Sequence, residues 1–191
     1  MRLQLKYGDS LLDVELPERS LYTVLTPKAL PKIEDLSGAV LNALREPVGS
    51  PTLKELVNAN DRVAVIVSDI TRPCPTRKIL PSLLGGLKRI GVPYDRVSLI
   101  FATGIHRRQT VEEQKSIIGP EVFGKVKVYE NDAWDASTHQ NLGVTGRGTP
   151  ASIDVRVASC DFMMAIAQHR PTLFCWLWWR SEVSSAWNSL R

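Results

Sequence analysis

Two continuous apolar runs of the kind found in buried β-strands stand in the middle of the chain, at residues 63–67 and 97–102. Between them, residues 80–90 carry apolar side chains at the spacing of an amphipathic helix. Continuous apolar runs are typical of parallel strands, which are covered on both faces. A similar run at 161–167 predicts one more buried strand. The pattern therefore predicts an α/β fold with a mainly parallel sheet flanked by helices.

Alternation of apolar and polar residues at the start of the chain indicates a different local structure. Residues 3–7 and 11–16 alternate on either side of Gly8-Asp9, which favours a β-hairpin. A further short strand is predicted at 22–25, before Pro27. We therefore expect a small N-terminal β element in addition to the α/β sheet.

Helix signals occur on both sides of the first buried run. Residues 33–44 have helical apolar spacing, and the segment 47–51, rich in proline and glycine, separates them from a short helix at 53–57 that Ser50 is expected to cap. Later in the chain, Thr110 and Glu113 have the spacing of a capping box at the start of another helix.

The region between that helix and the last buried run is less regular. Gly119-Pro120 is expected to end the helix, and residues 126–129 predict a strand. A polar loop follows at 131–135, in which we expect Trp134 to pack at the base of the loop. Residues 147–150 predict a turn before Ile153.

Polar residues follow each of the two central runs. Ser68-Asp69-Ile70-Thr71-Arg72-Pro73 follows the first, and Thr103-Gly104-Ile105-His106-Arg107 follows the second. Neighbouring parallel strands end at the same edge of a sheet, where open α/β folds place their ligands. The side chains expected to converge in one crevice at this edge are Asp69, Arg72, His106 and Arg107.

These residue types suit an enzyme that acts on a small acid. Arg72 offers a planar fork of donors for a carboxylate or phosphate. Asp69 can orient a donor or accept a proton, and His106 can transfer protons near neutral pH. The structural alternative is a simple turn, in which Asp69 or Thr71 caps a helix that Pro73 begins, and His106 has no chemical role.

Composition narrows the class of protein. The chain has 191 residues, a net charge of +4 and 43% hydrophobic residues, which is typical of one globular domain, alone or with a fragment of another. It has no basic block that would indicate a nucleic-acid partner and no apolar segment that would indicate a signal peptide or membrane span. Its cysteines, Cys74, Cys160 and Cys175, form no metal-binding pattern and favour the reducing cytoplasm.

Four segments together resemble the N-terminal domain of nickel-dependent lactate racemases. They are 68–75, 102–107, Asn131-Asp132-Ala133-Trp134-Asp135 and Arg147-Gly148-Thr149-Pro150, and the family has them in the same order. The resemblance covers residues 3–168 and implies an α/β domain over residues 1–168. It also implies a nickel-pincer nucleotide cofactor that takes a hydride from C2 of lactate, or of a related 2-hydroxy acid, and returns it to either face.

The resemblance implies a role for each residue that matches a family motif. Arg72 resembles the arginine that binds the substrate carboxylate, with Asp69 beside it. Asp69, Ser68 and Thr71 are implied to lie against the cofactor. His106 resembles one of two acid–base histidines. No residue of the chain is assigned as a ligand of the metal, and the oligomeric state stays open.

From about His169 onward the sequence departs from the family. The family continues with Pro-His, then Phe-Ala-Gly, a run of glycines and a lysine that holds the cofactor covalently. The chain instead becomes rich in tryptophan, with four of its five tryptophans after position 175.

A shift of reading frame explains this departure. Tryptophan has the single codon TGG, so reading one base later turns Trp176, Trp178 and Trp179 into glycine. In the same frame Thr172 can become histidine and Glu182 can become lysine, which restores the family motif. We therefore interpret residues 169–191 as an out-of-frame tail, and expect a chain that ends early and is inactive.

Other interpretations stay open. Residues 173–179 could form a buried strand of a diverged protein, or an anchor at a membrane surface. The chain could also be a non-catalytic module that binds a small acid, or another oxidoreductase on the same fold.

Overall fold

The computed structural model divides the chain into two compact units, residues 1–33 and 34–191, which are described separately below. The residues that it describes are 2–20, 23, 28, 31–72, 74–167 and, for the backbone alone, 179–180. Among them, no helix is both long enough and apolar enough to cross a membrane.

The N-terminal unit is the predicted hairpin. Strands β1 (Arg2–Tyr7) and β2 (Ser10–Glu15) pair antiparallel, followed by a 3₁₀ turn, η1 (Glu18–Ser20). Gly8 turns the chain with a φ of +57°, a backbone conformation that glycine adopts without strain. The strand predicted at 22–25 lies outside the described residues, apart from Thr23, which is in neither helix nor strand.

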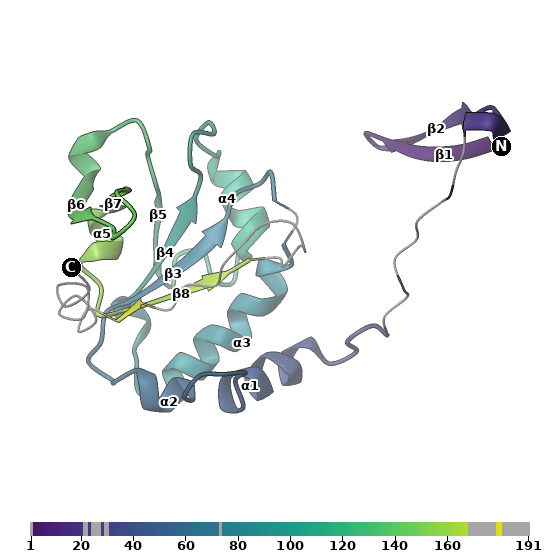
Figure 1. Ribbon diagram of the computed structural model, residues 1–191. Coiled ribbons are helices and arrows are strands. Elements are labelled where there is room, and N and C mark those ends of the chain that lie inside the picture. Colours follow the sequence, from purple (N-terminus) through teal and green to yellow (C-terminus); the bar gives the residue numbers. More distant parts are fainter. Residues whose placement is uncertain are drawn as a thin grey trace. The chain divides into compact units, whose positions relative to one another are not determined.

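The second unit contains the predicted parallel sheet (Figure 1). Its four parallel strands lie in the order β5-β4-β3-β8 and are β3 (Val63–Ser68), β4 (Val97–Ala102), β5 (Lys127–Glu130) and β8 (Phe162–Ile166). The chain builds outward from β3 to β4 and β5, and then returns to the other side of β3. The strand order therefore reverses between β3 and β8, and ligands of open α/β folds bind at such a point.

Helices cover one face of this sheet, as Figure 1 shows. They are α1 (Leu36–Arg45), α2 (Leu53–Leu56), α3 (Thr76–Arg89) and α4 (Val111–Ile118). Alternate residues of the strands, such as Val65 and Phe101, are buried there with Leu80 and Leu87 of α3. This core holds β3 and β4 in place, and it therefore determines where the loops that follow these strands leave the sheet.

On the opposite face, Ala64 and Ile100 pack with Val157 and Cys160, which lie in a region that the sequence pattern does not predict. A hairpin of β6 (His139–Val144) and β7 (Pro150–Asp154) leads into a short helix, α5 (Val155–Ala158). The turn predicted at 147–150 lies in this hairpin, where the Gly148 N–H donates to the Thr145 carbonyl. Short 3₁₀ turns, η2 (Tyr94–Arg96) and η3 (Ala136–Thr138), precede β4 and β6.

Two predicted helix starts are wrong in detail because a better capping side chain lies nearby. α1 begins at Leu36, three residues later than expected, since the Asp35 carboxylate accepts from the Gly38 N–H at 2.8 Å. α2 is capped by Thr52 and not by Ser50, because Thr52 forms a capping box with Glu55. A side chain that satisfies the free N–H groups of the first turn decides where a helix begins.

Other boundaries also shift or are confirmed. α3 begins at Thr76, before the apolar spacing at 80–90 becomes visible. α4 has the predicted capping box of Thr110 and Glu113, and it ends at Gly119. Trp134 is 78% exposed, so the expectation that it packs at the base of its loop is wrong.

Of the tail, only residues 179–180 are described, as a two-residue strand, β9 (Trp179–Arg180), antiparallel to β8. The predicted out-of-frame tail otherwise lies outside the described residues.

Candidate functional site

The loop after β3 is organised around a buried carboxylate. Asp69 is only 3% exposed, and its Oδ1 accepts from the Thr71 N–H at 3.1 Å and from the Thr71 hydroxyl at 2.6 Å. The Asp69 carbonyl accepts from the Arg72 N–H at 3.1 Å. Aspartate commonly closes such turns by accepting from the backbone two residues later. The turn explains how the sequence holds a carboxylate at the edge of the sheet.

The loop after β4 brings His106 to this carboxylate. Gly104 turns the loop with a φ of +58°, and the His106 N–H donates to the Thr103 carbonyl at 3.1 Å. His106 Nδ1 then lies 2.5 Å from the Asp69 Oδ2 and 3.5 Å from the Thr71 hydroxyl. The structure therefore places Asp69 and His106 together at the carboxyl edge of β3 and β4, as expected.

Electrostatics determine how the two side chains share the proton. Burial opposes ionisation of Asp69, but the hydrogen bonds from Thr71 and His106 outweigh it and hold the pKa of the Asp69 carboxyl below its ordinary value. An ionised carboxylate can only accept, so Nδ1 of His106 must donate to it. When the ring carries a single proton, its lone pair is then on Nε2, and the side chain is 44% exposed.

Asp69→Asn is expected to destabilise the fold in a pH-dependent way. Since the pKa of Asp69 is lowered by folding, its contribution is fully present above its unfolded value of about 3.9 and is lost as the pH falls through the folded value. Urea unfolding at pH 7 should show a loss of roughly 1.5–3 kcal/mol in the free energy of unfolding, as for hydrogen bonds to charged groups. The loss should shrink at pH 3, and Asp95→Asn, at an exposed aspartate, is the control. A penalty that stays constant between the two pH values would contradict this account of the carboxylate.

The other predicted site residues differ in their placement. Ser68 ends β3 and is half-buried, while Arg72 is exposed in the same turn as Asp69. Arg107 was expected in the crevice, but it forms an ion pair with Glu113 at 2.7 Å. Arg107 and the capping box lower the pKa of Glu113 to about 2, which keeps this carboxylate charged beside the arginine. Arg107 is therefore held at the start of α4 and does not join the Asp69–His106 pair.

Two buried polar residues that the sequence analysis did not single out, Thr103 and Gln109, hold this edge together. Thr103 is buried and its hydroxyl donates to the Asn131 carbonyl. Gln109 is also buried, and it contacts the Ile70 N–H and the carboxylate of Glu130. These residues lie in loops with no apolar periodicity, so only the three-dimensional pairing reveals them.

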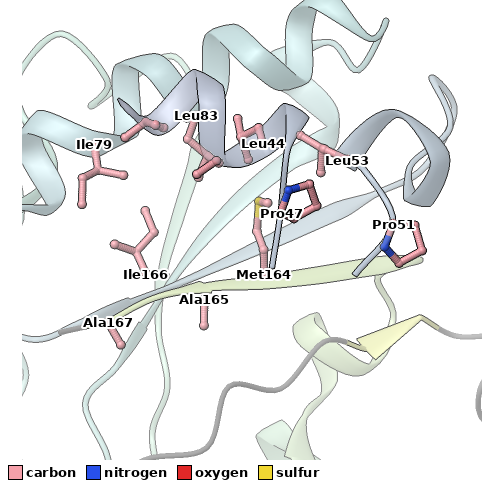
Figure 2. Close-up of a pocket in the computed structure, with 12 residues that line it drawn as sticks. Leu44, Pro47, Pro51, Leu53, Ile79, Leu83, Met164, Ala165, Ile166 and Ala167 are labelled. Atoms are coloured by element: carbon pink, nitrogen blue, oxygen red, sulfur yellow. The ribbon is translucent and has the colours of Figure 1, made fainter. Parts of the chain in front are cut away.

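An apolar cavity of about 280 Å³ lies away from this pair, between α1, α3 and β8. Figure 2 shows Leu44, Leu83, Met164 and Ile166 around it. The residues that line it include no acid, base or cation.

Comparison with known proteins agrees with the fold and the motifs. Residues 7–172 match the family described as the lactate racemase N-terminal domain. The chain is 27% identical over 174 residues to a lactate racemase of Thermoanaerobacterium thermosaccharolyticum, an alignment that covers 90% of the chain and 41% of the relative. It is 30% identical over 126 residues to a lactate racemase of Lactiplantibacillus plantarum, covering 66% of the chain and 30% of the relative.

Solved structures give the same result for the fold. The lactate racemase apoprotein of T. thermosaccharolyticum superposes with a TM-score of 0.73 and 26% identity, over 86% of this chain and 38% of that one. A crystal structure of a Thermotoga maritima protein, at 16% identity and a TM-score of 0.52 over 68% of this chain and 32% of that one, shares the fold alone. The chain spans less than half the length of the relatives it matches. With its match over residues 7–172, the chain belongs to the lactate racemase N-terminal domain family.

Proposed function

We propose that the chain carries the acid–base and carboxylate-binding part of the site of a racemase for lactate or a related 2-hydroxy acid. The observation that carries the proposal is the hydrogen bond between Asp69 and His106. Asp69 lies in the same turn as Arg72. The names of the relatives support the reaction class. Because the chain spans less than half of their length, the complete activity requires the part of the protein beyond these residues.

Each residue has a role that its chemistry allows. Nε2 of His106 accepts the proton of the substrate hydroxyl and gives it back. Asp69 holds the ring in the tautomer that leaves Nε2 able to accept, and it stabilises the imidazolium that forms. Arg72 binds the substrate carboxylate through paired N–H donors. A base and a carboxylate clamp on one loop edge are what a hydroxy acid needs for orientation and proton transfer.

The described residues fit the nucleotide part of the family's nickel-pincer cofactor better than its metal. Among them, no group of three or more His, Cys, Asp or Glu side chains could hold a metal ion. The hydroxyl of Thr76, at the start of α3, is buried and has no hydrogen-bond partner, and Pro75 provides no side-chain cap there. Ser68, Asp69 and Thr71 would hold the cofactor from the adjoining loop. Hydride exchange at C2 of the substrate is the chemistry that the cofactor supplies when bound.

We infer further that residues 1–168 are the family domain and that 169–191 are an out-of-frame tail. The family match ends at residue 172, close to the proposed shift. The tail has Thr172 and Glu182 where the shifted frame places the second histidine and the cofactor-binding lysine. The 191-residue chain is then inactive. We call the product of the gene read one base later, from about codon 169 to its stop codon, the frame-restored protein. This frame-restored protein is the enzyme.

Arg72→Ala in the frame-restored protein tests the carboxylate clamp. Loss of the clamp should cost about 2–5 kcal/mol in kcat/KM, the range found when one partner of a desolvated charge pair is removed. Arg72→Lys should restore little, because an ammonium cannot form the paired bonds of a guanidinium. Steady-state kinetics with lactate give the values, and Arg147→Lys, in the exposed β6–β7 turn, is the control. Unchanged kcat and KM in Arg72→Ala would remove Arg72 from the site.

A further inference from the structure

We propose that Gln109 is a positioning residue that sets the relative position of Asp69 and His106 by linking the loops after β3 and β4 to the end of β5. The inference rests on the proposed function, in which this pair transfers the proton. Gln109 is 7% exposed and lies between His106 and Thr110, the residue that caps α4. It contacts neither member of the pair in a hydrogen bond, so its effect is exerted through the backbone.

The first contact joins the loop after β4 to the loop after β3. Oε1 of Gln109 accepts from the N–H of Ile70 at 2.8 Å. Ile70 directly follows Asp69, so this bond fixes the peptide unit that carries the buried carboxylate. Because His106 is three residues before Gln109, the same side chain sets the distance between the two loops that meet in the Asp69–His106 hydrogen bond.

The second set of contacts fixes the side chain of Gln109 itself. Its Nε2 donates to Oε1 of Glu130 at 3.1 Å, and its own N–H donates to the same oxygen at 2.9 Å. Glu130 ends β5, and its carbonyl accepts from Arg156 at 2.8 Å. The carboxylate can only accept, so it determines which end of the amide is the donor and directs Oε1 toward Ile70.

The geometry of the site depends on the hydrogen bonds of Gln109, because only one hydrogen bond joins Asp69 to His106 across the two loops. Thr71 orients Asp69 from within its own loop, and Thr103 fixes the loop after β4 to the end of β5. Gln109 adds the cross-loop bond to the backbone next to Asp69. A small displacement of an acid–base pair has a large effect on proton transfer, so we expect the hydrogen bonds of Gln109 to matter for the reaction and not only for the fold.

The test uses the 191-residue chain and the titration of Asp69, which needs neither substrate nor cofactor. Q109M keeps the length of the side chain and removes its hydrogen bonds. Carbon-detected NMR of the Asp69 carboxyl should show its pKa move upward, toward the ordinary aspartate value, because the bond to His106 loosens while the fold is retained. Q140M, at an exposed glutamine on β6, should leave the titration unchanged.

A second pair of variants decides the question if Q109M does not fold. Q109E places a carboxylate against Glu130 and should shift the Asp69 titration upward, whereas the double variant Q109E/E130Q restores a donor–acceptor pair and should return it toward the wild-type curve. The proposal is overturned if folded Q109M titrates as wild type does, or if the double variant is no closer to wild type than Q109E. An inactive frame-restored enzyme with these shifts intact would count against the proposed function alone.

Discussion

His106→Ala in the frame-restored protein is expected to lower kcat for lactate racemisation by roughly 10²–10⁴-fold, the usual contribution of a general acid–base residue. The reason is the geometry of the pair. Asp69 holds the Nδ1 proton, so Nε2 is the atom that can take the hydroxyl proton and return it. KM should change less than kcat, because Arg72 still binds the carboxylate. Steady-state rates in both directions, from L- and D-lactate, give the measurement.

His139→Ala is the matched control for this prediction. His139 begins β6, and its ring contacts Asn131 and the Asp135 carbonyl, with neither Asp69 nor His106 among its hydrogen-bond partners. Its loss should affect stability and leave kcat near the wild-type value. If His106→Ala turns over at the wild-type rate, His106 has a structural role and the assignment of the acid–base pair is wrong.

The 191-residue chain itself is expected to show no racemisation and no covalently attached cofactor when it is produced with cofactor-loading machinery. Glu182 stands where the proposed reading frame places the cofactor-binding lysine, and a glutamate cannot form that covalent link. Thr172 has no imidazole to serve the second face of the substrate. Intact-mass spectrometry of the chain should give the mass of the polypeptide alone, and chiral analysis should find only the enantiomer supplied.

The frame-restored protein is the control for the 191-residue chain. Made in the same way, it should gain the mass of the cofactor and racemise lactate. Replacing the restored lysine by alanine should remove the added mass. Racemisation by the 191-residue chain with nickel bound would overturn both the frameshift and the role assigned to the missing lysine.

The sheet and the Asp69–His106 pair could be predicted from the sequence because their signals are strong. Buried parallel strands are continuous apolar runs, as at Val63–Ser68 and Val97–Ala102. Once the strands are parallel and adjacent, the residues that follow them must meet at one edge. The convergence of Asp69 and His106 at that edge follows from the topology, whereas their hydrogen bond is known only from the structure.

Other features could not be predicted, because they depend on which side chains meet in three dimensions or because they lack an apolar pattern. Arg107 carries the right charge for the crevice, but the capping-box carboxylate of Glu113 is nearer and binds it. The β6–β7 hairpin has little apolar alternation, since much of it is exposed. Gln109 lies in an irregular loop, where nothing in the local sequence distinguishes it from a solvated glutamine.

Trp134 is exposed although we expected it to pack, so residue type alone does not predict whether a side chain is buried. Tryptophan is highly buried on average, but this one belongs to a polar turn whose backbone is held by Asp132, which accepts from the Trp134 N–H at 3.1 Å. Local hydrogen bonds set the direction of the loop, and the side chain follows.

The central claim is that this domain binds and orients a 2-hydroxy acid for racemisation by hydride removal and return at C2. Its most direct test is to incubate the cofactor-loaded, frame-restored protein with L-lactate deuterated at C2 and to analyse the product by chiral chromatography and mass spectrometry. The account predicts an equal mixture of D- and L-lactate that retains the deuterium. A nickel-loaded protein that leaves lactate and related 2-hydroxy acids unchanged, or a racemic product that has exchanged its deuterium with water, would contradict it.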